Sequence, residues 1–381
     1  MSDEPRRPVV GRVLASEDDT LRVQRPGGVL ESVRLAPTDA NFAVGDLVHV
    51  DARGTVERVF RHPRGEWPEP KDDALRFLDG VRWTRLARRA DLIHETRDHF
   101  RDAGFLEVDT PRVVASVGTE VHIDPSRVTQ RPEAGAQPAN RFLIPSPEHH
   151  MKRLLAAGAP AIFSMGPVWR DGERGAHHRP EFTLLEWYRP WAELSALFKD
   201  CETWLQSLHS GSTLTYQGHT LSWGGPWPRL PFLDLLENRA GVVEPQRLTP
   251  EEQLGAFVDG VEPTLGRERP EFVVDYPVAF ASLARRQPEN PELAERFELY
   301  AAGLELANAF GELTDAAEQR ARCEADNRMR AEAGREELPL DEPFLAALES
   351  GMPPSAGIAV GVDRVIMLLC DAATIDEVLP F

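Results

Sequence analysis

The sequence predicts an α+β protein in which a small N-terminal β-barrel precedes a larger domain of helices and strands. Residues 8–62 contain five short β-rich runs separated by turns rich in Gly, Asp and Pro, as in a small closed barrel. From Thr84 onward the spacing of apolar residues becomes helical. Farther along, two strand-like apolar runs flank a loop crowded with Arg and His. The hydrophobic content of 41% and charged content of 28% are those of a globular protein.

The N-terminal module is assigned to residues 1–62. Its segment from Val44 to Val50 resembles strands of OB-type nucleic-acid-binding barrels. Such barrels stack bases on aromatic side chains, and Phe42 and Phe60 are the only candidates here. A docking or purely structural barrel is therefore favoured over a nucleic-acid-binding one. The predicted strands are Val9–Leu14, Leu21–Gln24, Leu30–Leu35, Asp46–Val50 and Thr55–Phe60.

A linker and a long helix follow the module. Residues 63–82 are assigned to the linker because this stretch is rich in proline and charge, and residues 83–381 to the second domain. Gly104 stands where the C-cap of the helix belongs, and a short strand with Leu106 and Val108 follows. Further helices are expected within residues 191–209 and 231–260. The apolar positions on one face of the first helix are Leu86, Ala90, Ile93 and Phe100.

The two runs around the cationic loop predict a site for a polyphosphate. Arg170 ends the first run, and Glu186 and Tyr188 alternate with Phe182 along the second. Residues two apart share a face of a strand, so an aromatic ring, a carboxylate and a phenol point the same way. Burying a carboxylate on such a face requires a partner for it. The alternative is an ordinary hairpin with a solvated basic turn.

Composition excludes several classes of protein. No apolar run approaches the ~20 residues of a membrane span, and the N-terminus lacks the apolar core of a signal peptide. The cysteines, Cys201, Cys323 and Cys370, are scattered and form no CxxC pair. We therefore expect a cytoplasmic protein with no membrane partner and no structural zinc. The net charge of −19 disfavours broad contact with nucleic acid, although a local arginine patch can coexist with it.

Three segments resemble the signature motifs of the class II aminoacyl-tRNA synthetases. Arg89–Pro111 resembles motif 1, which builds the dimer interface in that family, and Val168–Pro190 resembles motif 2. Gly357–Leu369, a strand that runs through glycine into a helix, resembles motif 3. Each motif alone is a weak signal, but the three occur in the family order over about 280 residues. The resemblance implies a catalytic core built on an antiparallel sheet flanked by helices.

Within that family the chain is most similar to the lysine branch, and in particular to the elongation factor P lysine ligases. The similarity implies ATP-dependent activation of lysine or β-lysine, transfer to a lysine side chain of elongation factor P, and a homodimer. We expect no charging of tRNA, because the chain leaves no room for a C-terminal anticodon-reading domain. The strings that carry the similarity are Ser146–Leu155, Glu186–Pro190 and Gly303–Asp315.

The resemblance assigns roles at an ATP site. Arg170 would hold the α-phosphate together with the substrate carboxylate, Arg364 would hold the γ-phosphate, and these are the two predicted catalytic residues. Planar guanidinium groups suit these roles because they bind phosphate oxygens bidentately. Glu298 and Glu305 would carry Mg²⁺ between the phosphates, and Phe182 would stack on adenine. The predicted ATP-binding residues are Arg170, Asp171, Gly172, Arg179, Phe182, Glu305, Leu306, Gly361 and Arg364.

The resemblance also assigns an amino-acid site. Glu148 would bind the amino group of the substrate, and Glu312 with Tyr188 would hold its ε-ammonium. Ser146 and Pro147 also fit a helix start, as N-cap and first helical residue. Ala359 adds a methyl group where lysyl-tRNA synthetases have glycine, which would narrow the pocket and could favour β-lysine. The predicted substrate-binding residues are Ser146, Pro147, Glu148, Tyr188, Glu312 and Ala359.

Three positions depart from the family pattern. Gly172 stands where the family usually has a glutamate that recognises adenine, with Glu173 next along, and Arg179 stands where it has asparagine. Ala309 replaces a glycine. These departures motivate a catalytically silent regulatory protein as one alternative function. The other is a truncated lysyl-tRNA synthetase, or a paralogue that adenylates another amino acid.

Overall fold

The computed structural model describes residues 9–38, 41–62, 73–77, 80–131 and 133–381. The chain divides into two compact units, a small unit of residues 1–91 and 376–381 and a large unit of residues 92–375. Most of the predicted linker lies outside the described residues, because residues 63–72, 78 and 79 are not among them. None of the described helices combines the length and apolar character needed to cross a membrane.

All five strands predicted for the small unit are present. They form one antiparallel sheet in the order β3-β2-β1-β4-β5. No pairing between the edge strands β3 and β5 is found within the described part of the unit, so the sheet is open and a closed OB-type barrel is not confirmed. The strands are β1 (Val9–Glu17), β2 (Thr20–Gln24), β3 (Leu30–Arg34), β4 (Leu47–Val50) and β5 (Val56–Phe60).

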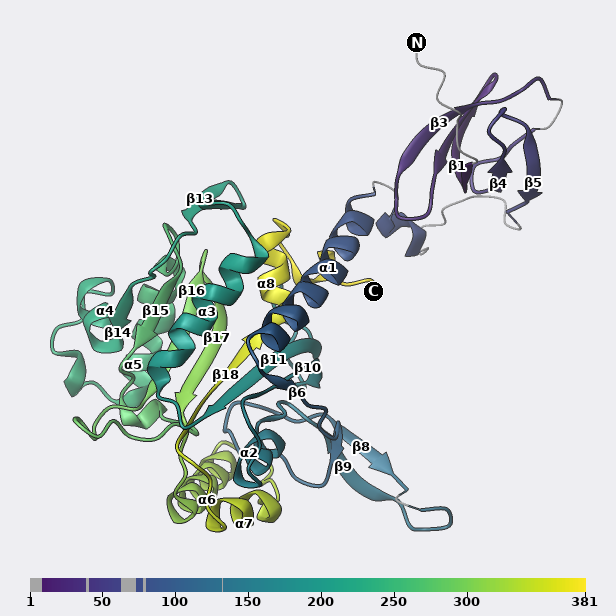
Figure 1. The fold of residues 1–381 in the computed structure, drawn as a ribbon. Coiled ribbons are helices and arrows are strands. Elements are labelled where there is room, and N and C mark those ends of the chain that lie inside the picture. The colour runs from purple at the N-terminus through teal and green to yellow at the C-terminus, as the bar shows by residue number, and fades with distance from the viewer. Residues whose placement is uncertain (1–8, 39–40, 63–72, 78–79, 132) are drawn as a thin grey trace. The chain divides into compact units, whose positions relative to one another are not determined.

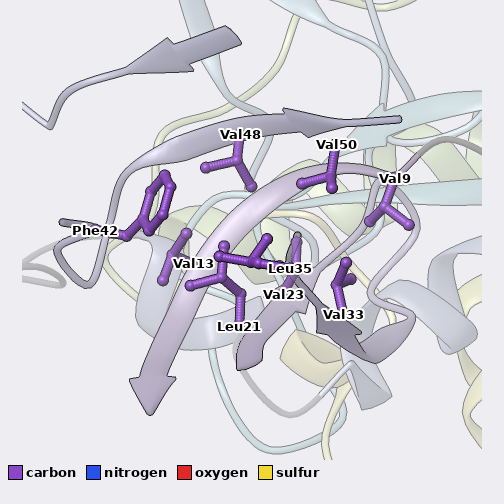
Figure 2. Close-up of a cluster of buried hydrophobic side chains, with 9 residues drawn as sticks. All are labelled: Val9, Val13, Leu21, Val23, Val33, Leu35, Phe42, Val48 and Val50. Carbon is purple, nitrogen blue, oxygen red and sulfur yellow. The ribbon is translucent and has the colours of Figure 1, made fainter. Parts of the chain in front are cut away.

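The small unit has a hydrophobic core of its own. Figure 2 shows nine apolar side chains that converge on one side of this sheet, among them Val13, Leu21 and Val23, which are fully buried. Phe42 is one of the nine, so one of the two aromatic residues considered for base stacking is a core residue. Phe60 is 68% exposed. Period-2 alternation along β1 and β2 places valine and leucine on the covered face.

The large unit is built on an eight-stranded sheet, visible in Figure 1, in the order β14-β15-β16-β17-β18-β11-β10-β6. The pairs between β15 and β10 are antiparallel, and only the outermost pairs, β14 with β15 and β10 with β6, are parallel. The predicted α+β class with an antiparallel core sheet is therefore confirmed. The strands are β6 (Leu106–Glu107), β10 (Ile162–Trp169), β11 (Glu181–Pro190), β14 (Arg229–Pro231), β15 (Glu271–Val274), β16 (Arg296–Ala301), β17 (Leu304–Gly311) and β18 (Ser355–Gly361).

Helices and two small sheets surround this sheet. The helical insert expected within residues 231–260 is broken into α4 and α5, and a short π-helical turn follows it. The helices are α1 (Val81–Asp102), α2 (Glu148–Ala156), α3 (Leu194–Leu208), α4 (Phe232–Asn238), α5 (Pro250–Ala256), α6 (Ala316–Glu332), α7 (Glu342–Glu349) and α8 (Val362–Leu369). The small sheets contain β7 (Val113–Val114), β8 (Arg127–Gln130) and β9 (Ala139–Leu143), and β12 (Thr213–Tyr216) with β13 (His219–Ser222).

Strand β11 separates an apolar layer from a polar one. Trp187, on one face, lies 4.8 Å from the Phe100 ring of α1 and 5.9 Å from the Trp204 ring of α3. Its neighbours Glu186 and Tyr188 point to the opposite face. Phe100 was predicted to be buried and is, but Leu86 and Ala90 are not; the buried positions of α1 are Leu92, Thr96 and Phe100. The face of α1 is set by this aromatic cluster rather than by the helix's own apolar spacing.

Candidate active site

The central strands of the large unit form the floor of a cavity of about 320 Å³. On β11, the side chains predicted to share a face do so, and Phe182, Leu184, Glu186 and Tyr188 all line the cavity. Ala359 of β18 lies between Glu186 on β11 and Asn308 on β17 in the sheet register. Two residues to either side on β18, Gly357 and Gly361 also line the cavity. The register therefore aligns three strands so that one face of each contributes.

The cavity brings together most of the predicted site residues. Asp171, Gly172, Pro147 and Glu298 do not line it. Gly172 occupies a turn with a φ of +75°, a conformation that favours glycine, while the adjacent Glu173 does line the cavity. The predicted residues that line it are Ser146, Glu148, Arg170, Arg179, Phe182, Tyr188, Glu305, Leu306, Glu312, Ala359, Gly361 and Arg364.

One end of the cavity is cationic. The guanidinium of Arg170 lies over the Phe182 ring at 5.2 Å, and its buried Nε has no hydrogen-bond acceptor among the described residues. Arg364 donates to the carbonyl oxygen of Glu305 at 2.7 Å and to Nε2 of His178 at 2.5 Å. Burial, and then the charge of Arg364, lower the pKa of His178, which favours the neutral ring that this hydrogen bond requires. The arrangement suits an anionic ligand.

The other end is anionic and is built around a buried lysine. Lys152 Nζ lies 2.6 Å from Glu148 Oε1 and 2.5 Å from Glu312 Oε2. Lys152 is 0% exposed and Glu312 is 1% exposed. On β11, Glu186 accepts hydrogen bonds from Ser146 Oγ at 2.6 Å and from the Tyr188 hydroxyl at 2.9 Å. Tyr188 and Glu312, predicted to act as a pair, are thus each bonded to a different partner.

Burial changes the pKa values at this end. It raises the pKa of Glu186 to about 8, with the negative charge of Glu148 as the next cause. It raises the pKa of Glu312 to about 7, although the nearby Lys152 ammonium opposes the change. A buried carboxylate of this kind ionises readily only when a cation lies beside it. The two acids are therefore suited to binding ammonium groups near neutral pH.

Ser146 has both a structural and a site role. Its hydroxyl accepts from the backbone N–H of Glu148 at 3.0 Å and donates to Glu186. Helix α2 begins at Glu148 with Pro147 at the N-cap position, one residue later than predicted, within the usual uncertainty of helix ends. The first turn of α2 thus points Glu148 into the cavity. Pro147, at the N-cap position, does not line the cavity.

Glycine is required at position 357. A methyl group there would overlap the Tyr188 ring and the Glu312 carboxylate. The backbone of β18 therefore approaches these two side chains more closely than any other residue would allow. This close approach holds the phenol and the carboxylate at the anionic end.

The two predicted Mg²⁺ ligands differ in their surroundings. Glu305 lines the cavity, and its Oε2 lies 3.6 Å from Arg364 Nη1. Glu298 does not line the cavity, although it lies opposite Asn308 in the sheet register. It accepts hydrogen bonds from the hydroxyls of Tyr276 and Tyr300 and from Arg296. No group of three or more His, Cys, Asp or Glu side chains suited to a metal occurs in the described parts of the chain. Burial and the charge of Glu298 raise the pKa of Glu305, so a cation beside these carboxylates would be stabilised.

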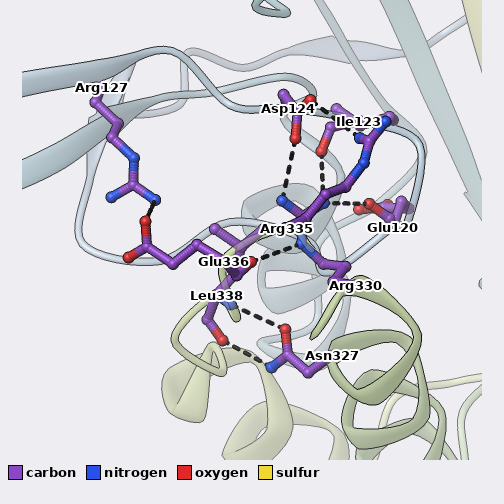
Figure 3. A network of polar contacts seen from close by, with 9 residues as sticks. All are labelled: Glu120, Ile123, Asp124, Arg127, Asn327, Arg330, Arg335, Glu336 and Leu338. Carbon is purple, nitrogen blue, oxygen red and sulfur yellow. Dashed lines mark hydrogen bonds and ion pairs between the residues drawn. The ribbon is translucent and has the colours of Figure 1, made fainter. Parts of the chain in front are cut away.

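A loop at the cavity rim is anchored by α6. Glu120 and Ile123 line the cavity, and Figure 3 shows how their backbone is held. Arg330 of α6, which is 2% exposed, donates to both carbonyl oxygens at 2.9 Å, and to the carboxylate of Asp124 at 3.2 Å. The carbonyl oxygen of Asp124 in turn accepts from the N–H of Asp171 at 2.7 Å. The rim is therefore linked to the cationic loop.

Several residues of the site were not assigned from the sequence, among them Lys152, Glu186 and Asn308. Lys152 carried a signal, since Glu148 and Lys152 are four apart on a helix, the spacing of an ion pair. Glu186 was placed on the correct face of its strand but was given no role. Asn308 lies opposite Ala359 in the sheet register, and nothing in the local sequence indicated that it belongs to the site.

Residues 73–381 match the family described as tRNA synthetases class II (D, K and N). The chain therefore belongs to the class II aminoacyl-tRNA synthetase family and is an enzyme of the ligase type, as the three motifs predicted.

Three curated relatives that match the chain share one name. It is 43% identical over 307 residues to the elongation factor P–(R)-β-lysine ligase of Edwardsiella ictaluri. It is 41% identical over 308 residues to the ligase of Hamiltonella defensa, and 40% identical over 305 residues to that of Proteus mirabilis. Each match covers 78% of this chain and 94% of the relative.

Proposed function

We propose that this protein activates lysine or β-lysine with ATP and transfers it to a lysine side chain of elongation factor P. The observation that carries the proposal is the opposite charge of the two cavity ends. Arg170, Arg179 and Arg364 suit the phosphates of ATP, while Glu148, Glu186 and Glu312 suit a substrate with two ammonium groups. The names of the curated relatives support (R)-β-lysine and elongation factor P as the two other reactants.

In the first step, the substrate carboxylate attacks the α-phosphorus of ATP and pyrophosphate leaves. Arg170 would hold the α-phosphate and the attacking carboxylate, and Arg364 would hold the γ-phosphate. Such a transfer depends on alignment and on neutralising charge as it develops. Mg²⁺, when bound beside Glu305 and the ATP phosphates, supplies further neutralisation. Phe182, already packed under Arg170, would stack on adenine.

In the second step, the neutral amine of the acceptor lysine attacks the carbonyl carbon of the mixed anhydride. A C–N bond forms, the C–O bond to AMP breaks, and the amine loses its proton. A protein amine is a sufficient acceptor, and tRNA charging is not expected. The net charge of −19 disfavours extended contact with a phosphate backbone. The small unit would be a docking or structural module of OB-like kind, and residues 89–111 would form a homodimer interface.

ATP–pyrophosphate exchange with a panel of amino acids tests the first step. Lysine or β-lysine should support exchange, and Arg170→Ala and Glu305→Ala should each lower it by ~10²-fold or more, because each removes a charge contact in the transition state. Arg174→Ala is the matched control, since Arg174 is exposed in the same loop and does not line the cavity. Near-normal exchange in either site variant contradicts the assignment. Absence of exchange with every amino acid would favour the silent regulatory alternative.

A second assay tests the acceptor. The enzyme with its radiolabelled aminoacyl-adenylate is offered either total tRNA or elongation factor P. Label should appear in the protein, and transfer should rise with pH below the lysine pKa of ~10.4, since only the neutral amine attacks. Label in tRNA alone would restore the truncated synthetase alternative.

A further inference from the structure

The buried position of Lys152 is exceptional for this chain. Lysine occurs only three times, and arginine supplies almost all of the 43 Lys and Arg residues. The other ion pairs of the described residues use arginine or histidine. At residue 152 the chain keeps a lysine with no exposed surface. An ammonium is a compact point charge, whereas guanidinium is a wide planar fork, so a lysine suits the space between two converging carboxylates.

Lys152 acts from behind the cavity wall. Its partners Glu148 and Glu312 line the cavity, whereas Lys152 does not. Helix α2 carries Glu148 and Lys152 one turn apart, and Glu312 follows the end of β17. The ammonium at 2.6 and 2.5 Å from these acids therefore joins the helix to the sheet. It can set the position and charge of both acids without touching a ligand in the cavity.

The anionic end contains more negative than positive charges. Three carboxylates, Glu148, Glu186 and Glu312, face one buried ammonium. With all groups ionised, two negative charges remain uncompensated. A diamino acid brings two ammonium groups, so it restores neutrality in a place where an unpaired charge is costly.

We propose that Lys152 is a positioning residue that holds Glu148 and Glu312 ionised and separated, and thereby makes the subsite selective for an amino acid with two ammonium groups. This inference rests on the proposed function, and it deepens it by naming what sets the substrate class. Without the Lys152 ammonium, two close carboxylates would repel each other, and their pKa values would rise. One would then be protonated at neutral pH and would bind an ammonium group poorly.

Charged and titratable groups around this pair contribute to its response to pH. Burial of Lys152 lowers its pKa, and the charges of Glu148 and Glu312 more than offset this, so its pKa is raised overall. The ammonium therefore stays charged across the pH range of an assay. The other charged or titratable groups around the pair are Glu186 and Tyr188 on β11, and Arg285 in the loop before β16.

The experiment compares Lys152→Met with wild type and with Lys199→Met, a control in which an exposed lysine of α3 is removed. KM and kcat for lysine- and β-lysine-dependent exchange are measured between pH 6 and 9. In Lys152→Met, KM for the amino acid should rise by ~10–100-fold, as when a residue that orients a ligand group is removed. The pH at which kcat/KM reaches half its maximum should rise by about one unit or more. The KM for ATP should change little in Lys152→Met. In the control variant Lys199→Met, neither the KM values nor the pH profile should change much.

A purely structural role would lower thermal stability and activity equally at every pH. An unchanged amino-acid KM and pH profile in folded Lys152→Met overturns the inference. If that variant does not fold, Lys152→Gln, which keeps a polar side chain but removes the charge, replaces it. An unchanged amino-acid KM and pH profile in folded Lys152→Gln would also overturn the inference. Wild-type enzyme that exchanges with neither lysine nor β-lysine would instead contradict the proposed function itself.

Discussion

Glu186 and Glu312 predict a pH dependence of substrate binding. Their pKa values, about 8 and about 7, lie above the ordinary glutamate value, so each is neutral below its own pKa and binds an ammonium group only above it. The amino-acid KM should therefore rise as pH falls from 8 to 6, approaching about tenfold per unit of pH below the pKa of each acid that must ionise. Steady-state exchange across this range measures it, and Glu186→Gln should remove the upper step. A KM that is constant from pH 6 to 9 would contradict the assignment.

The same two acids predict how stability responds to pH. A carboxylate whose pKa is raised by folding binds more protons in the folded state than in the unfolded state, so the free energy of unfolding falls as pH rises from about 4.5 to 8. A bound diamino acid supplies the missing cations. The rise in melting temperature caused by the substrate should therefore be larger at pH 8.5 than at pH 6.5.

Gly357 predicts a steric effect confined to the amino-acid end. Gly357→Ala should push the Tyr188 ring and the Glu312 carboxylate out of place, at a cost of ~1–3 kcal/mol, and raise the amino-acid KM while ATP still binds. Gly224→Ala is the matched control, because an added methyl group there meets nothing within 4 Å. Equal kinetics for the two variants would show that the close approach at Gly357 is not needed.

At the scale of elements, α6 predicts the stability of the cavity rim. Arg330 bonds Glu120, Ile123 and Asp124 across a gap of about 200 residues in sequence. Arg330→Met leaves these acceptors without their donor, which should lower the free energy of unfolding by ~1.5–3 kcal/mol. Arg335→Ala is the control, since Arg335 is 36% exposed and contacts Asp124 at the surface; its effect should lie within ~1 kcal/mol. Urea unfolding measures both, and equal losses would refute the anchoring role.

At the scale of the whole molecule, residues 1–70 of the small unit should be dispensable for adenylation. The buried residues of its core lie within residues 9–50, with Val56 and Val59 packed against them, and the family match begins at residue 73. The curated relatives align with 78% of this chain, yet 94% of their own length is covered. Deleting residues 1–70 should therefore preserve exchange activity. Loss of exchange in a folded deletion variant would contradict this, whereas loss of transfer alone would identify the small unit as an acceptor-docking module.

Much of the architecture, and the set of side chains that share a face of β11, could be predicted from local sequence. The five strands of the small unit fall within a few residues of their predicted bounds, because valine and leucine alternate and turn residues separate them. The shared face of Phe182, Glu186 and Tyr188 follows from the period of a strand and needs no tertiary information. The three motif segments indicated the family for the same reason, since each is a continuous string.

What only the tertiary structure decided involves contacts between distant segments. Lys152 meets Glu312 across 160 residues, and the strand register places Asn308 beside Ala359. Glu298 repeats the spacing of Glu305 and Glu312, yet its carboxylate accepts hydrogen bonds from two tyrosines and an arginine and does not line the cavity. The predicted barrel is an open sheet in the described residues, because a barrel closes only when its two edge strands, here β3 and β5, pair with each other. Periodicity along a strand or helix tells which side chains share a face; which charges meet across that face is set by packing, where a buried carboxylate must find a cation.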